Sequence, residues 1–376
     1  CPAGATRLGQ KLCKADGTEV TYPKQLLPDK VKWGKEYYDP DYRDNNRINS
    51  HKTGTAPCKT ACPAHIAVQG YLKKAAQGEY TEALALIKKQ NPFPAVCGRV
   101  CNKRCESECT RGKIDAPVSI DAVKKFVADL DLNAEDRFVP EKTVQSTHGA
   151  FDEKIAIIGG GPAGLSAAYY LAQMGYKPTV FEKNPIPGGM LTYGIPSYKL
   201  EKDVIAAEID IIKELGAEIK CGVEVGKDIT IAQLKEQGYK AFYIAIGCQG
   251  GRRPGVKNDD APGTHIAVEY LRHCFEHRED TFDGSVVVIG GGNVAADCAF
   301  TAAQNGAEQV EMFVRRRLSD MKISKTEYLE LLYHQINISP LCNPEKIEKH
   351  DDGLLLQTHR NRYDNGKTEP LPDSSV

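Results

Sequence analysis

The chain has 376 residues, a formal net charge of −1, and 41% hydrophobic residues. This length is enough for roughly two or three domains with cores of their own. A net charge near zero gives no general attraction to nucleic acid or to anionic membranes, and no stretch of 18 or more apolar residues predicts a membrane span. We therefore expect a protein that binds no nucleic acid and does not cross a membrane.

Residues 1–50 have no sustained hydrophobic period and are predicted to form an extended arm or linker. The chain begins with Cys1 and Pro2 rather than Met, so we expect it to be part of a longer polypeptide. Cys1 and Cys13 are interpreted as isolated free thiols, and a ligand role for them stays open.

Six of the 13 cysteines are concentrated in one short stretch, namely Cys58, Cys62, Cys97, Cys101, Cys105 and Cys109. An even number of cysteines can form disulfides in a secreted protein. In an intracellular enzyme, clustered cysteines are more often metal ligands. Because two nucleotide-binding patterns follow in the same chain, we expect a cytoplasmic protein whose clustered cysteines bind metal.

Residues 51–135 are predicted to form a small helical domain around these cysteines. Apolar residues recur at helical spacing in 66–72 and 83–87, and another helix is expected over 120–130. The four cysteines of 97–109 are spaced by four, which would place them on one face of an ideal helix. We expect this segment to bend instead, so that the sulfur atoms converge.

Thiolate clusters hold either zinc or iron–sulfur centres. The spacing of Cys58 and Cys62 lies within the range of structural zinc sites. Pro63, directly after Cys62, is typical of iron–sulfur segments, and an adjacent flavin domain would supply electrons to such a centre. We favour a 4Fe-4S cluster, with zinc and inert thiols as the alternatives.

Residues 154–172 have the pattern of a buried strand, a glycine turn and a helix. They contain a G-x-G-x-x-G fingerprint with a proline and an alanine at the start of the helix: Gly159, Gly161, Pro162, Ala163 and Gly164. The glycines allow a tight turn, a close approach to pyrophosphate and close helix–strand packing. The helix N-terminus attracts the phosphates.

The next predicted strand, 177–182, ends in Glu182, which lies 18 residues after Gly164. A carboxylate that binds a ribose hydroxyl is expected at that place. We therefore assign FAD to a Rossmann-like half-domain over residues 152–254. A glycine-rich turn of another α/β protein is the alternative.

Two further segments of this half-domain are candidates for flavin contact. The first is a loop whose paired glycines allow a close backbone approach to a flat cofactor, with candidate residues Lys183, Gly188, Gly189, Met190, Leu191, Gly194, Ile195 and Pro196. An ordinary Gly/Pro loop is the alternative. The second is a strand over 242–246, expected to be buried and to end at Gly247, where ligands of open α/β sheets bind. A helix is expected over 200–216.

The glycine pattern returns 131 residues later, in Gly290, Gly292, Asn293, Val294 and Ala295. Alanine is allowed in place of the third glycine. The following strand, 310–314, ends in arginines instead of an acid. A guanidinium group binds a 2′-phosphate, which a carboxylate would repel. We therefore assign Arg315 and Arg316 to NADP(H) in a domain over 255–376, with a solvated charge run as the alternative.

From Cys58 to about Asp320 the chain resembles the NADPH-dependent glutamate synthase small (beta) subunit family. That family includes flavoprotein subunits of bifurcating NADH–ferredoxin:NADP oxidoreductases and the iron–sulfur region of dihydropyrimidine dehydrogenase. The shared motifs lie at 62–63, 92–94, 98–109, 159–165, 188–196, 199–202, 290–293 and 314–316. The resemblance implies an α/β protein in which a helical iron–sulfur domain precedes two Rossmann-like domains, for FAD and then for NADP.

The resemblance also implies a function. NADPH would reduce FAD, and iron–sulfur clusters would relay electrons to or from a partner subunit such as a synthase, a ferredoxin or another redox enzyme. No side chain is then expected to act as a nucleophile or general acid, because the flavin carries the chemistry. The alternatives are a subunit of an electron-bifurcating ferredoxin/NAD(P) transhydrogenase and a non-catalytic, cluster-carrying assembly module.

The chain departs from the family pattern in three places. Two-cluster relatives carry a C-x2-C pair shortly before Cys58, but residues 49–57 contain no cysteine. We expect one cluster and leave a second open. Relatives often have a Gln or Glu ligand where this chain has Lys124, which cannot bind iron while protonated. The chain also ends at Val376 without the family's Gly-Gly-Asp motif, so we expect a FAD domain that is incomplete at its C-terminus.

Overall fold

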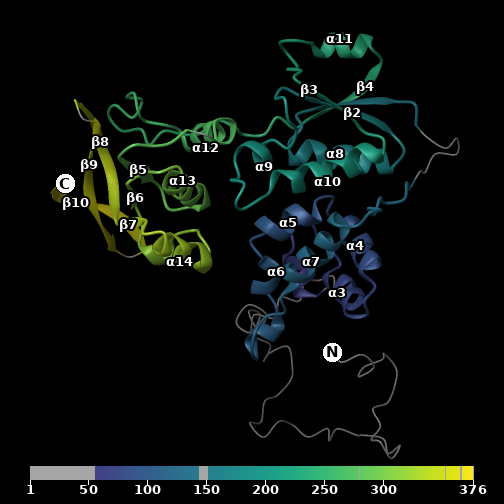
Figure 1. Ribbon diagram of the computed structural model, residues 1–376, viewed down its shortest axis with the longest axis horizontal. Coiled ribbons are helices and arrows are strands. Elements are labelled where there is room, and N and C mark those ends of the chain that lie inside the picture. The colour runs from purple at the N-terminus through teal and green to yellow at the C-terminus, as the bar shows by residue number, and fades with distance from the viewer. Residues whose placement is uncertain (1–55, 144–150, 279, 352, 365, 376) are drawn as a thin grey trace, which may run out of the picture. The chain divides into compact units, whose positions relative to one another are not determined.

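The computed structural model describes residues 56–143, 151–278, 280–351, 353–364 and 366–375 (Figure 1). The chain divides into two units, and the described elements belong to the second unit, Cys58–Val376, apart from Pro57, the first residue of α2. The predicted arm over 1–50, with Cys1 and Cys13, lies outside the described residues.

The N-terminal part of the second unit is helical, as predicted. Its elements are α2 (Pro57–Ala61), α3 (Val68–Ala76), α4 (Tyr80–Lys88), α5 (Pro94–Val100), α6 (Arg104–Ser107), the 3-10 turn η2 (Thr110–Lys113) and α7 (Ile120–Leu132). Apolar residues from both predicted periodic segments form its core, including Tyr71, Leu84 and Ile87, each at most 2% exposed. The helix predicted over 120–130 is α7, two residues longer.

The bend predicted among the four later cysteines is present. Helix α5 ends at Val100, Cys101 is extended, and Lys103 has a left-handed backbone with φ +54° before α6 begins. Helix α7 lies against α5 at Gly98, where a Cβ atom would be only 2.8 Å from the Lys125 Cα. The helices can approach this closely because Gly98 has no side chain.

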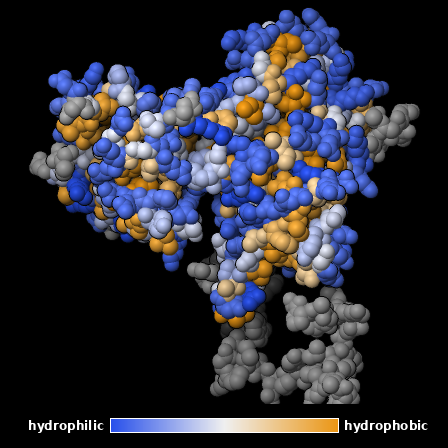
Figure 2. All heavy atoms as spheres, in the orientation of Figure 1, coloured by the Kyte–Doolittle hydropathy of each residue, from blue (hydrophilic) through white to orange (hydrophobic). Residues whose placement is uncertain are grey.

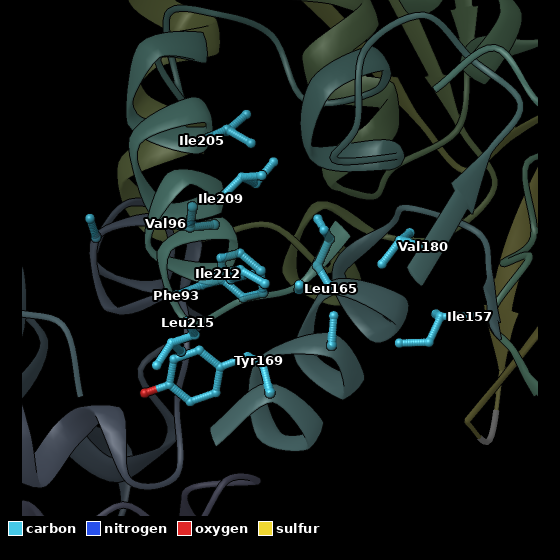
Figure 3. Close-up of a cluster of buried hydrophobic side chains, with 14 of the residues drawn as sticks. Phe93, Val96, Ile157, Leu165, Tyr169, Val180, Ile205, Ile209, Ile212 and Leu215 are labelled. Carbon is cyan, nitrogen blue, oxygen red and sulfur yellow. The ribbon is translucent and has the colours of Figure 1, made fainter. Parts of the chain in front are cut away.

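The first Rossmann-like half-domain contains a parallel four-stranded sheet in the order β3-β2-β1-β4. Its elements are β1 (Lys154–Ile158), α8 (Pro162–Gln173), β2 (Lys177–Glu182), α9 (Met190–Tyr193), α10 (Lys202–Glu214), β3 (Glu218–Cys221), α11 (Ile231–Glu236) and β4 (Tyr239–Ile244). Figure 3 shows Phe93 and Val96, which come from the helical part, beside Ile209 and Ile212 of α10 in one hydrophobic cluster. The core of this half-domain therefore includes the start of α5.

The prediction that strand 242–246 is buried is wrong. Tyr243 and Ile244 of β4 are 46% and 64% exposed, and Ile246 beyond the strand is 66% exposed. The reason is position: β4 is the last strand of the four-stranded order and pairs only with β1 among the described strands. Figure 2 shows hydrophobic residues scattered among hydrophilic ones on the visible face.

The second Rossmann-like domain has a parallel three-stranded sheet in the order β5-β6-β7, followed by an antiparallel sheet in the order β10-β9-β8. Its elements are α12 (Ala267–Glu276), β5 (Ser285–Ile289), α13 (Asn293–Gln304), β6 (Gln309–Val314), η3 (Leu318–Asp320), α14 (Lys325–Tyr333), β7 (Asn337–Pro340), β8 (Cys342–His350), β9 (Gly353–Asp364) and β10 (Lys367–Ser375). Helix α13 buries one face against β5 and β6. No helix in the described part of the chain is long and apolar enough to cross a bilayer.

Candidate dinucleotide and iron–sulfur sites

The first glycine turn connects β1 to α8 at the C-terminal end of an inner strand. Gly159 has φ +110°, and a Cβ there would be 2.3 Å from the Ala245 carbonyl oxygen. A Cβ on Gly164 would be 2.0 Å from the Gly159 oxygen. Both positions require glycine because backbone packs directly on backbone. A Cβ on Gly161, by contrast, would make only an ordinary contact, 3.9 Å from the Gly189 Cα, and Pro162 begins the helix.

The acid predicted to bind ribose lies at this turn. Glu182 is 4% exposed, and one carboxylate oxygen accepts a 2.6 Å hydrogen bond from the Gly160 backbone N–H. The other oxygen accepts bonds from the backbone and side-chain nitrogens of Asn184, at 2.8 and 2.7 Å. Because each carboxylate oxygen has two lone pairs, Glu182 retains capacity to accept a bond from a ribose hydroxyl.

The loop with paired glycines contacts the same turn. The Gly188 N–H donates to the Gly160 carbonyl oxygen at 2.7 Å, and a Cβ on Gly189 would be 2.9 Å from the Gly161 Cα. Both loop glycines have positive φ, +114° and +55°. The backbone conformations that glycine allows at these two positions therefore let the loop pack closely against the first glycine turn.

Sequence reasoning missed Lys202 as a residue that holds this loop. Its ammonium group donates to the Leu191 carbonyl oxygen at 3.0 Å and also to that of Ile195. Burial, with repulsion from Arg278, lowers the pKa of Lys202 to about 8. Lys202 belongs to the 199–202 motif that the chain shares with the family, but no role was predicted for that motif.

The other predicted flavin residues occupy varied environments. Gly194 is buried, whereas Lys183, Ala163 and Gly247 are exposed, and Gly247 has φ +67° with open space around it. Met190, Leu191, Ile195 and Pro196 are partly buried around α9. The structure therefore brings the turn, Glu182 and the start of the 188–196 loop together. The glycine surface, the free helix N-terminus and the acid fit the pyrophosphate and ribose of a dinucleotide.

The second glycine turn shows why alanine is acceptable at 295. Gly290 has φ +142°, and a Cβ added to it would be 3.2 Å from the Ala295 Cβ. At the equivalent first turn, any side chain on Gly164 would overlap the Gly159 oxygen. The second turn is therefore wider, and one methyl group fits beneath it.

A cleft of about 500 Å³ adjoins this second turn and is called the cofactor cleft below. Gly290, Gly292, Arg315 and Arg316 all line it, although they come from two separate segments. Asn293 and Val294 are exposed at the start of α13. Four of the predicted NADP(H) residues thus meet around one opening, whereas Asn293, Val294 and Ala295 do not line it.

The third arginine of the run has different contacts. Arg317 makes two 2.9 Å hydrogen bonds to the carboxylate of Asp320, and its guanidinium carbon lies 3.6 Å from the centre of the Tyr363 ring. These bonds hold the pKa of Asp320 below its usual value. Arg317 therefore neutralises the one acid that lines the cofactor cleft among the described residues.

Cys58 is on α2, Cys62 directly follows α2, Cys97 is on α5, Cys101 follows α5, Cys105 is on α6, and Cys109 precedes η2. All six are partly buried, and every cysteine in the described part of the chain is a free thiol. The structure therefore gives no support to the disulfide alternative.

Three of these thiols share one apolar environment. Cys58, Cys62 and Cys105 pack against the same apolar cluster of the helical part. Burial raises the pKa of Cys58, and negative charge at Cys109 and Cys62 raises it further. Burial and charge at Cys101 raise the pKa of Cys105 to about 11. Such thiols become thiolates only when a positive centre compensates them, as bound iron does.

The sixth thiol, Cys97, donates to the Asn91 side-chain oxygen at 3.6 Å. Among the described residues, no three Cys, His, Asp or Glu side chains converge closely enough to hold a single metal ion. A zinc site with bonds of about 2.3 Å needs such convergence. A four-iron cluster places its own iron and sulfide between the thiolates, so its ligand sulfurs lie farther apart than those around a single zinc ion.

Lys124 lies near Cys97 and Cys101 and carries a positive charge. It is 6% exposed, and its ammonium group is 2.6 Å from the carboxylate of Asp121. Burial alone would lower the pKa of Lys124, but Asp121 and negative charge at Cys101 and Cys97 outweigh burial and raise it. A protonated lysine cannot donate electrons to iron, as the sequence led us to expect.

Comparison with known proteins agrees with these features. Residues 44–136 match the family described as dihydropyrimidine dehydrogenase domain II, 4Fe-4S cluster, and residues 153–368 match the pyridine nucleotide-disulphide oxidoreductase family. The fold and its sites are thus those of a flavin- and NAD(P)H-linked oxidoreductase with an iron–sulfur domain.

Within that class, the chain belongs to the family of the glutamate synthase small chain. It is 34% identical to "Glutamate synthase [NADPH] small chain" of Escherichia coli K12 over 94% of this chain and 77% of that protein. It is 36% identical to "NAD-dependent dihydropyrimidine dehydrogenase subunit PreT" of the same strain, over 78% of this chain and 70% of that protein. The predicted family, fold class and cofactor types are confirmed at this level.

Other relatives extend well beyond the matched region. The chain is 38% identical to "NADP(+)-dependent formate dehydrogenase subunit beta" of Moorella thermoacetica over 85% of this chain, but it spans only 48% of that protein. A solved structure, Mycobacterium tuberculosis FprA in complex with NADPH, matches 60% of this chain and 68% of its own with a TM-score of 0.51 and 18% identity. That likeness supports the fold.

Proposed function

We propose that this chain is the electron-entry part of a larger redox enzyme, linking NADPH through FAD and one 4Fe-4S cluster to a partner subunit. The observation that carries this proposal is the contrast between its two glycine turns. Glu182 lies at the first, and Arg315 and Arg316 lie at the second. An acid suits a ribose without a 2′-phosphate, and a pair of guanidinium groups suits a ribose that carries one.

When the three cofactors are bound, FAD would accept hydride from NADPH, and the cluster would carry the electrons away one at a time. The residues of this chain hold and orient these groups. Glu182 fixes the ribose end at the first turn, and Lys202 holds the neighbouring loop by its carbonyls. Arg315 and Arg316 select the phosphorylated dinucleotide in the cofactor cleft. No side chain needs to exchange a proton with substrate.

A partner is supported by the names of relatives. The formate dehydrogenase and dihydropyrimidine dehydrogenase relatives are each named as one subunit of an enzyme. We propose a redox protein as the partner here, either an electron acceptor or an electron donor.

The test is an anaerobic visible spectrum with an iron assay, recorded before and after NADPH is added. Flavin bands and a broad iron–sulfur shoulder, both bleached by NADPH, would support the proposal. A shoulder without flavin would favour the assembly-module alternative, and zinc without iron would overturn the assignment of the cysteines. Reduction of NADP⁺ with NADH and reduced ferredoxin would favour the transhydrogenase alternative.

A further inference from the structure

A third cation lines the cofactor cleft, and sequence reasoning did not select it. Lys322 lies outside the arginine run, yet it faces the same opening as Arg315 and Arg316. None of these three side chains forms an ion pair with another described residue, whereas Arg317 is fully engaged by Asp320. The opening therefore holds three cations that have no ion-pair partner among the described residues.

The backbone of Lys322 is held at the glycine turn. Its N–H donates to the Gly291 carbonyl oxygen at 3.1 Å, and Lys322 forms a parallel bridge with Gly292. Lys322 is thus anchored to the glycine turn itself. Arg315 and Arg316, by contrast, follow the C-terminal end of β6. The backbones that carry the cations therefore start from two places, the glycine turn and the end of β6.

The two places correspond to two groups on one ligand. In a Rossmann-like fold the pyrophosphate lies at the glycine turn and the helix N-terminus, while the 2′ position of the ribose lies near the end of the next strand. Gly292 is the residue before α13, so the free N–H groups of that helix open beside Lys322. An ammonium group there supplies a charge that backbone N–H groups lack.

We propose that Lys322 binds the pyrophosphate of the dinucleotide and so sets affinity for NADP(H) and NAD(H) alike. Arg315 and Arg316 alone discriminate between the two. This inference rests on the proposed function, because it assumes that the cofactor cleft is the nicotinamide dinucleotide site.

Two partial ligands separate these roles in the whole chain. ADP carries the diphosphate without a 2′-phosphate, and 2′-AMP carries a 2′-phosphate without the diphosphate. Replacing Lys322 with Met should weaken ADP and NADP⁺ binding about tenfold or more, the effect of one lost charge-assisted hydrogen bond, and leave 2′-AMP unchanged. The double change of Arg315 and Arg316 to Ala should weaken 2′-AMP binding and leave ADP binding unchanged. Affinities are measured by calorimetry or by competition.

Controls keep the result specific. Lys322→Arg should retain most of the ADP affinity, and Lys325→Met changes a nearby exposed lysine outside the cleft. Circular dichroism confirms that each variant is folded. Unchanged ADP affinity in Lys322→Met, or weakened 2′-AMP binding, would overturn the inference while leaving the proposed function intact. A wild-type chain that binds no NADP⁺ would instead refute the proposed function, and the inference with it.

Discussion

Replacing Glu208 with Gln should remove a pH dependence of stability that the buried carboxyl creates. Glu208 lies on α10 and is 1% exposed, and one of its oxygens has no hydrogen-bond partner among the described residues. Burial raises its pKa to about 7, although Lys88 and Arg137 act in the opposite direction. Lys88 is equally buried, and burial lowers its pKa. Both groups therefore shift toward their neutral forms.

The magnitude follows from the two states of Glu208. In the unfolded chain the carboxyl loses its proton near its ordinary pKa of 4.5, whereas the folded chain keeps the proton up to about pH 7. Folding is therefore favoured below that window, and the advantage is lost as the pH rises through it. Because each pH unit corresponds to about 1.4 kcal/mol, the wild type should lose about 3 kcal/mol relative to the Gln variant.

This difference in unfolding free energy is tested by urea unfolding, followed by circular dichroism, at about pH 5 and about pH 8. Titrating groups that do not interact with Glu208 act equally in both proteins, so the difference between wild type and Glu208→Gln isolates this carboxyl and its coupling to Lys88. Glu214→Gln, an exposed change on the same helix, should leave the pH dependence unchanged. Equal pH dependence in wild type and Glu208→Gln would refute the reasoning, because the carboxyl would then be ionised across the range as a partner of Lys88.

Three further outcomes are expected. Changing Arg315 and Arg316 together to Ala should raise the KM for NADPH about 10- to 100-fold and that for NADH far less, since charged hydrogen bonds are lost; Lys325→Ala, an exposed change outside the cofactor cleft, is the control, and an equal effect on both cofactors would contradict the 2′-phosphate assignment. Cys101→Ser should remove iron, measured by a chelation assay, while circular dichroism shows the α/β part still folded; unchanged iron content would mean that the ligand set is wrong. Gly98→Ala should lower the unfolding free energy by about 1–3 kcal/mol, because the new Cβ meets α7 at 2.8 Å; wild-type stability in urea would show that the two helices separate freely.

Local pattern was enough to predict much of this protein. Helical spacing predicted the core residues Tyr71 of α3 and Leu84 and Ile87 of α4. Apolar residues at this spacing lie on one face of their own helix, whatever that face packs against. The glycine fingerprints predicted both dinucleotide turns because a positive φ, as at Gly159, and close backbone packing, as at Gly164, are requirements of single positions.

Tertiary structure decided what depends on neighbours distant in sequence. Strand β4 is apolar, yet it is exposed because it lies at the edge of its sheet, and an apolar run does not reveal strand order. Arg317 resembles Arg315 in sequence but is engaged by Asp320 and Tyr363. Lys322 reaches the cofactor cleft only because its backbone pairs with Gly291 and Gly292. A charge acquires its role from what surrounds it in space, and only the folded chain determines those surroundings.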